Sequence, residues 1–94
     1  MKTADERRKL YKAAIDACGV DAQQWVAVEE LGELLTALSQ MRRGRIRPED
    51  VADEIADATI MLEQLKMMLG VEKRVELGIE RKIERLQRRL ESQR

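Results

Sequence analysis

Two pairs of carboxylates have the spacing of a shared cation site. Glu30 and Glu33 are three residues apart, and Glu54 and Asp57 repeat that interval. On a helix, residues i and i+3 project from nearly the same face about one turn apart, so each pair can share one ion. If the two helices pack antiparallel across a short connection, four oxygen ligands converge.

The setting of these acids favours a bound cation. The residues that share their helical stripes are otherwise apolar: Val26 and Ala37 beside the first pair, and Met61, Leu65 and Met68 beside the second. An unpaired charge among apolar neighbours is costly unless something neutralises it. The alternative is that the acids form ordinary surface pairs with the many arginines, at intervals of three or four residues.

The composition narrows the metal and the chemistry. The chain has no histidine and one cysteine, Cys18, which excludes Ser-His and Cys-His hydrolases, typical zinc sites and the Glu-x-x-His di-iron pattern. We expect Cys18 to be a small core residue. Ligands that are all oxygen favour Mg²⁺ or Mn²⁺ before Zn²⁺. Because Mg²⁺ keeps positions open for water and phosphate, phosphoryl chemistry is indicated.

Four amphipathic helices must position these acids, and no segment alternates as a strand does. The first runs from about Thr3 to Cys18 and opens with a Thr3–Glu6 capping box. Asp21 with Gln24 opens the second helix in a similar way, and that helix precedes the basic run Arg42-Arg43-Gly44-Arg45. The third begins at Pro48 and stops at Gly70, and the last runs from about Glu72 to Glu91.

The hydrophobic periodicity predicts an all-α, four-helix bundle-like domain of antiparallel helices. The main core stripe expected for the second helix is Val28, Leu31, Leu35 and Leu38. The last helix carries the packing seam Val75, Ile79, Ile83, Leu86 and Leu90. The 94 residues form a single domain, 1–94, and so small a chain leaves much apolar surface uncovered. We therefore expect homo-oligomerisation, as a homodimer or a dimer of dimers.

Charge and hydropathy limit the partners and the location. Eighteen basic and 18 acidic residues balance, so no overall field attracts nucleic acid, and we expect no specific nucleic-acid binding. The charged amino terminus has no apolar signal-peptide core, and no stretch approaches a membrane span. We expect a cytoplasmic protein without membrane contact. The basic loop between the acidic helices is either a solvated turn or a contact for triphosphate or for acids of a partner subunit.

At the acids the chain resembles the MazG-like all-α nucleoside triphosphate pyrophosphohydrolases. Their hallmark, E-E-x-x-E followed by E-x-x-D, corresponds here to Glu29-Glu30-Leu31-Gly32-Glu33, then 20 residues, then Glu54-Ile55-Ala56-Asp57. The resemblance covers nearly the whole chain after the first ten or so residues. It implies that Glu30, Glu33, Glu54 and Asp57 coordinate Mg²⁺, with Glu29 as an additional ligand or as the group that orients water.

The resemblance also implies contacts to the nucleotide. Lys82 fits a late lysine that reaches the phosphates in such proteins, and Arg85 or Arg89 supplies a second contact. Many relatives have Asn where this chain has Leu86, whereas a compact branch of the family ends in the K-x-x-R-L form found here. Trp25 is a candidate for base stacking or for packing, and Gln24 is a candidate for hydrogen bonding a base or sugar or for the helix cap.

The expected function is Mg²⁺-dependent pyrophosphohydrolysis of an NTP or dNTP between the α and β phosphates. The products would be a nucleoside monophosphate and pyrophosphate, and removal of non-canonical nucleotides is one possible purpose. A narrower substrate, such as a phosphoribosyl-nucleotide or dUTP, is a second expectation for the same architecture. A third, from another class, is a non-catalytic helical dimer that binds a partner through these stripes.

Overall fold

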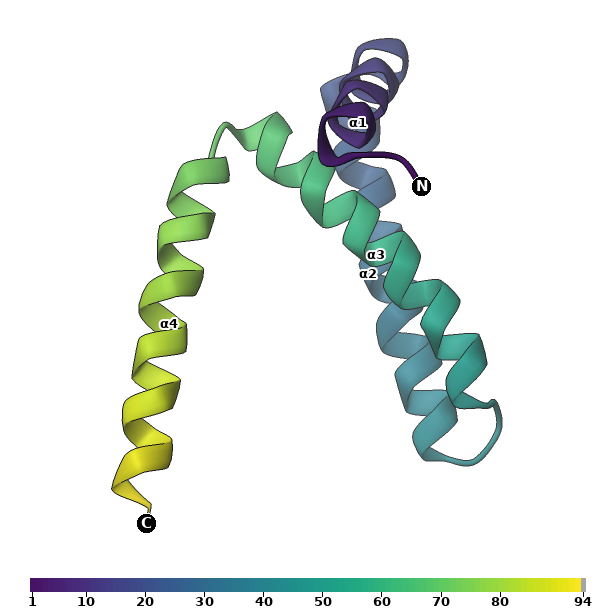
Figure 1. Ribbon diagram of the computed structural model, residues 1–94. Helices are drawn as coiled ribbons and strands as arrows, with labels where there is room; N and C mark the ends of the chain where they lie inside the picture. Colours follow the sequence, from purple (N-terminus) through teal and green to yellow (C-terminus); the bar gives the residue numbers. More distant parts are fainter. Residues whose placement is uncertain (94) are drawn as a thin grey trace.

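The computed structural model describes residues 1–93, and these residues form four helices and no strand. Figure 1 shows their order along the chain: α1 (Ala4–Cys18), α2 (Val20–Arg42), α3 (Pro48–Leu69) and α4 (Glu72–Ser92). The prediction of an all-α protein with four helices is confirmed. Arg94, the last residue of the predicted domain, lies outside the described residues.

The helix ends follow their local signals, with one exception. The Thr3–Glu6 capping box is present, with the Glu6 amide donating to Thr3 Oγ1 at 3.1 Å, and Pro48 opens α3 as predicted. Gly70 ends α3 in the left-handed conformation, at φ 65°. The cap predicted at Asp21 is wrong, because α2 begins at Val20, directly after Gly19 at φ 91°, and no side chain caps it.

Helices α2 and α3 form an antiparallel hairpin that contains the core (Figure 1). Their contact line, which we call the α2–α3 seam, repeats at intervals of three and four residues, as in coiled coils. The seam consists of Gln23, Ala27, Glu30, Leu34 and Ala37 on α2, and Val51, Glu54, Ala58 and Met61 on α3. It includes every buried apolar residue of the described chain. Small alanines allow the two helices to approach closely.

The predicted core stripe of α2 does not face the core of the single chain. Leu35 is 70% exposed, and Val28 and Leu38 are also exposed. The reason is that α3 packs against the seam, which lies one residue earlier on the helix than each leucine of that stripe. The core position predicted for Cys18 is wrong as well, since this residue is exposed at the end of α1.

A buried amide pair fixes the register of the hairpin. Gln23 Nε2 on α2 donates to Gln64 Oε1 on α3 at 2.7 Å, and both side chains are buried. A slip of one turn would leave both amides without partners in an apolar environment. The pair therefore sets which residues of α3 lie opposite Glu30.

Replacing one member of this pair should destabilise the protein more than replacing both. Gln23→Leu leaves the Gln64 amide buried and unpaired, and we expect a loss of about 1–3 kcal/mol in the free energy of unfolding. The double variant Gln23→Leu/Gln64→Leu should recover most of that loss. Urea denaturation of the three proteins checks this, and equal destabilisation by the single and double variants would contradict it.

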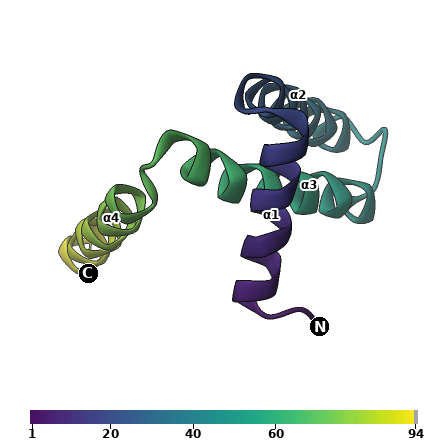
Figure 2. The same cartoon turned by 90° about the horizontal axis from the view of Figure 1, so that it is seen from above.

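The outer helices are attached less closely than the hairpin. Helix α1 crosses one end of the hairpin and contacts both α2 and α3 (Figure 2). Helix α4 packs only against α3 and then extends away, although Arg8 of α1 pairs with Glu72 at its start. In the part of the chain that the structure describes, no helix is long and apolar enough to cross a membrane.

Candidate metal centre

One acid from each predicted pair lies in the α2–α3 seam. Glu30 and Glu54 are partly buried, and each has one carboxylate oxygen, Oε2, that is enclosed and has no hydrogen-bond partner. Buried polar atoms in folded proteins nearly always have a partner. These two oxygens are therefore the feature of the site that a bound cation would explain directly.

Glu33 joins these two acids from the next turn of α2. One oxygen each from Glu30, Glu33 and Glu54 lies within 4.8 Å of the other two. Oxygens bound to one Mg²⁺ at about 2.1 Å are about 3.0 Å apart when they are adjacent and about 4.2 Å apart when they are opposite. The three carboxylate oxygens are thus within reach of one shared ion, and they are of the type that a hard divalent cation prefers.

Asp57 borders this group without being part of it. Its side chain is exposed, and the group of three carboxylates within reach of one another does not include it. Its negative charge nevertheless contributes to raising the pKa of both Glu30 and Glu54. The structure therefore brings together three of the four predicted ligands and places the fourth beside them.

The acids disfavour one another's ionisation. Burial is the main cause that raises the pKa of Glu30, and the charges of Glu33 and Asp57 raise it further. The pKa of Glu54 is raised by the same causes in the same order, with an added contribution from Asp53. Asp53 was not among the predicted site residues. A divalent cation would reverse this effect by stabilising the charged carboxylates.

Pairing with arginine does not account for these acids. The four ion pairs among the described residues join Arg8 to Glu72, Lys12 to Asp16, Arg47 to Glu49 and Lys66 to Glu63. None of them includes a site carboxylate. The sequence carries a matching signal, since no lysine or arginine occurs from Val20 to Met41 or from Pro48 to Leu65.

The hairpin has two chemically different faces, one on each side of the seam. On both helices the residues one position before a seam residue include acids, which together form the acidic face: Glu29, Glu33, Asp53 and Asp57. The large apolar residues one position after a seam residue form the apolar face: Val28, Leu31, Leu35 and Leu38 on α2, and Ile55 and Leu62 on α3.

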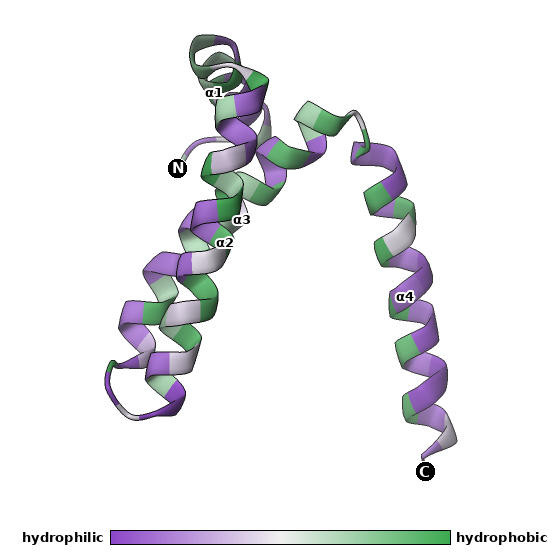
Figure 3. Ribbon diagram, turned by 180° about the vertical axis from the view of Figure 1, so that it is seen from behind, coloured by the Kyte–Doolittle hydropathy of each residue, from purple (hydrophilic) through white to green (hydrophobic). Residues whose placement is uncertain are grey.

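Antiparallel packing places each of these sets on one side of the hairpin. A step of one residue rotates the helix position by about 100°, and two facing helices of opposite direction turn toward the same side. The two stripes of each kind therefore lie side by side. Figure 3 shows the hydrophobic residues of α2 and α3 along the side that faces α4.

The two α2 residues predicted to contact the nucleotide, Trp25 and Gln24, do not both lie on the acidic side of the hairpin. A shallow groove on the acidic side is lined by Glu29, Gly32, Glu33, Thr36, Ala37 and Glu54. Trp25 is exposed one turn before Glu29 and is not part of the groove lining, whereas Gln24 directly follows the seam residue Gln23 and lies on the apolar side.

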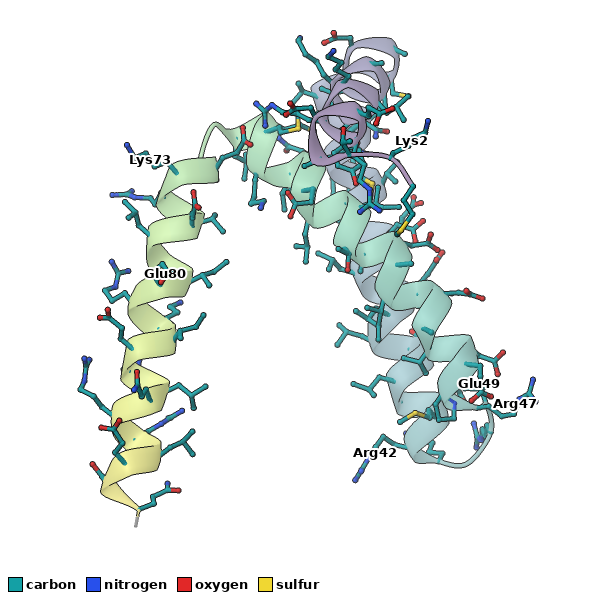
Figure 4. All side chains as sticks on the ribbon, viewed as in Figure 1. Lys2, Arg42, Arg47, Glu49, Lys73 and Glu80 are labelled. Atoms are coloured by element: carbon teal, nitrogen blue, oxygen red, sulfur yellow. The ribbon has the colours of Figure 1, made fainter. Side chains whose placement is uncertain are left out.

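Lys82 and Arg85 are not near the acids of their own chain. Both lie on α4, which packs only against α3, and both are exposed. The labelled residues of Figure 4 show the separation: Lys73 and Glu80 mark α4, while Arg42, Arg47 and Glu49 mark the far end of the hairpin. The basic loop is thus at the tip of the hairpin, and its Arg47 pairs with Glu49.

Comparisons of the chain with models of known protein families, with curated proteins and with solved structures find no match. The MazG-like resemblance therefore stays a prediction that depends on the motif residues themselves.

Proposed function

We propose that this protein is a Mg²⁺-dependent nucleotide pyrophosphohydrolase that cleaves an NTP or dNTP between the α and β phosphates. The observation that supports it most is the pair of enclosed, unpartnered oxygens of Glu30 and Glu54, with Glu33 within 4.8 Å of both carboxylates. All-oxygen sites with room for phosphate ligands suit Mg²⁺, and Mn²⁺ is a substitute.

The residues of the metal centre and its surroundings have distinct roles in this proposal. Glu30, Glu33 and Glu54 would hold the metal, with Asp57 as a further ligand. Mg²⁺ bound there supplies neutralisation of the phosphate charge and a water of lowered pKa. Glu29 at the edge of the groove would orient that water, and the exposed Trp25 would stack on the base. Lys82 and Arg85 would contact the phosphates.

Two further proposals concern the oligomeric state of the protein and its location in the cell. Self-association is proposed because the predicted core stripe of α2 is exposed in the single chain. A cytoplasmic location is part of the same proposal. The MazG-like resemblance supports the reaction but does not select the base or sugar.

The decisive experiment is a pyrophosphate-release assay over a panel of standard and damaged NTPs and dNTPs, with Mg²⁺, Mn²⁺ or EDTA. We expect turnover of at least one substrate with metal and none with EDTA. Asp57→Asn should reduce the rate by about 100-fold. The matched control Asp21→Asn, an exposed acid of the same type on α2, should leave it unchanged. No turnover of any substrate at high enzyme concentration would contradict the proposal.

The exposed apolar face favours a second candidate, a non-catalytic helical module that binds a protein partner. This candidate predicts that partner affinity is unchanged after chelation of divalent metals. Pyrophosphohydrolysis predicts turnover with Mg²⁺ that EDTA abolishes, whereas a non-catalytic module shows no turnover in either arm of the assay.

A further inference from the structure

Helix α4 carries a row of arginines on the side opposite its packing seam. Val75 and Ile79 of that seam line a groove shared with α3. Intervals of seven, four and three residues place the arginines within about 60° of the helix circumference, on nearly the opposite side. We call this row the arginine stripe: Arg74, Arg81, Arg85 and Arg88, all exposed. Figure 3 shows α4 as hydrophobic toward the hairpin and hydrophilic on its outer side.

The arginine stripe begins in a wide, shallow groove at the turn between α3 and α4. This groove has a volume of about 770 Å³ and is lined by Gly70, Val71, Lys73, Arg74, Leu77 and Arg81. Its lining includes three cationic side chains and no acid. None of these three side chains forms an ion pair within residues 1–93. The chemistry of the groove therefore suits an anion.

The charges of α4 are sorted by sign around the helix. Both signs occur in rows at intervals of four residues: Arg81, Arg85 and Arg89 in one row, and Glu76, Glu80 and Glu84 in the other. Like charges at this interval destabilise a helix, whereas opposite charges stabilise it. No ion pair between two residues of α4 forms in the described part of the chain. An external polyanion would neutralise the row of arginines.

We propose that the arginine stripe binds the phosphate backbone of duplex DNA without sequence preference. The length of the stripe identifies the ligand. From Arg74 to Arg88 the helix advances 14 residues, or about 21 Å at 1.5 Å per residue. One strand of a DNA duplex has a phosphate about every 3.4 Å along the axis, so the stripe spans about six phosphates. A single nucleotide would reach only part of it.

The composition and shape of α4 favour duplex DNA over other nucleic acids. Arginine forms bidentate contacts with phosphate, and such contacts carry no sequence information. The major groove of B-form DNA, about 12 Å wide, admits an α-helix, whereas that of A-form RNA is too narrow for side chains to read. Single strands are bound through stacking on aromatic side chains, and α4 contains none.

A protein or a lipid surface fits the arginine stripe less well. Protein interfaces have apolar or aromatic residues at their centre, and the only apolar residue that borders the stripe is Leu77. A helix that lies on a membrane buries its apolar side among the lipids. The apolar seam of α4 is on nearly the opposite side from the arginines, so a flat lipid surface cannot contact both.

The balanced charge of the whole chain conceals this surface. Helices α2 and α3 together contain ten acidic and two basic residues, whereas α4 contains seven basic and five acidic residues. The net charge excludes an overall field that attracts DNA, but a local stripe does not need one. The acidic hairpin should be repelled by DNA, which leaves α4, extending away from it (Figure 1), as the element that makes the contact.

The first test titrates the full chain into a fluorescently labelled DNA duplex of random sequence and follows the fluorescence anisotropy. EDTA is present throughout, so the candidate metal centre takes no part. We expect binding that weakens by at least about 100-fold between about 50 and 200 mM salt, because four phosphate contacts give a slope of about −3.6 in log K against log salt.

The double variant Arg81→Gln/Arg88→Gln should lose half of these contacts. We expect affinity at about 50 mM salt to fall at least about 10-fold and the slope to shrink by about 1.8. Glutamine keeps the helix propensity of arginine, and circular dichroism checks that α4 stays folded. Arg85 is left unchanged because the proposed enzymatic function assigns it to the substrate.

The control Arg42→Gln/Arg43→Gln removes the same charge from two exposed arginines at the tip of the hairpin and should bind DNA as wild type does. Equal weakening by the two double variants, or no binding of duplex DNA at about 50 mM salt, would overturn the proposal. An affinity for duplex RNA, or for vesicles of phosphatidylserine and phosphatidylcholine, that equals or exceeds the affinity for DNA would overturn it too. Because binding is measured without metal, its failure is distinct from a failure of the proposed enzymatic function.

Discussion

A Glu54→Gln variant is expected to lose Mg²⁺ binding and pyrophosphohydrolysis while its metal-free fold becomes more stable at pH 8. The amide keeps the size of the side chain but removes a charge that burial and the neighbouring acids disfavour. It also removes a ligand from the candidate metal centre, so we expect the rate to fall by about 100-fold or more. Higher metal-free stability together with lost metal binding is the combination expected of a ligand.

The pH dependence of stability gives this prediction a second readout. The pKa of Glu54 is raised above its ordinary value of 4.5, so the folded state favours the protonated carboxyl. The stability that this preference contributes is present below pH 4.5 and is lost as the pH rises through the raised pKa. The melting temperatures of wild type and Glu54→Gln should therefore be similar in acid and diverge toward pH 8 without metal.

Addition of Mg²⁺ at pH 8 should then raise the melting temperature of wild type and leave that of Glu54→Gln unchanged. Asp21→Asn on α2 is the control and should respond to Mg²⁺ as wild type does. Full metal-dependent turnover by Glu54→Gln would exclude this carboxylate as a ligand. A difference in melting temperature between wild type and Glu54→Gln that does not change with pH would exclude charge repulsion among the acids as its cause.

The ends of the helices could be predicted because their signals are local. Thr3 reaches the amide of Glu6 three residues later, Pro48 suits the first turn of a helix, and Gly70 adopts a left-handed conformation that other residues avoid. Each signal depends on a few adjacent residues. The Asp21 cap was wrong because Gly19 is the single residue between α1 and α2, so that α2 already begins at Val20.

The choice between neighbouring stripes on one helix could not be predicted in this way. On α2 the stripe of Val28 and Leu35 and the seam of Ala27 and Leu34 have the same period and differ by one residue. Hydropathy favours the first stripe, but α3 packs against the second. If the proposed dimer forms, the leucines are buried after all, because a hydrophobic pattern reflects burial in the whole assembly rather than in one chain.

In the candidate site, too, contacts set by local spacing could be predicted and contacts that depend on the packing of a distant helix could not. The spacing of Glu30 and Glu33 within one helix, with a short loop to Glu54, was enough to predict that these carboxylates meet. Lys82 and Arg85 were predicted from the resemblance, and the single chain keeps them apart from the acids. The position of α4 depends on what fills the opening beside it, which no helical period encodes.

Mixing two inactive variants should restore activity if α4 completes the partner's site. One variant carries Glu33→Gln in the candidate metal centre, and the other carries Lys82→Ala on α4. A heterodimer of the two contains one site with both defects and one site with none, because each site takes its acids from one chain and its lysine from the other. With random pairing of equal amounts, about one quarter of wild-type activity should return.

A mixture that stays inactive would identify a different arrangement of the site. If each site takes its acids and Lys82 from one chain, every site in the mixture keeps one defect, and the activity stays at the level of the separate variants. Adding Leu35→Asp to both chains provides the control, since a carboxylate on the exposed apolar stripe of α2 should abolish the restored activity by preventing self-association. Restoration that survives this substitution would show that the lysine reaches the acids without the apolar contact, and it would separate the chemistry of the site from the assembly proposed to complete it.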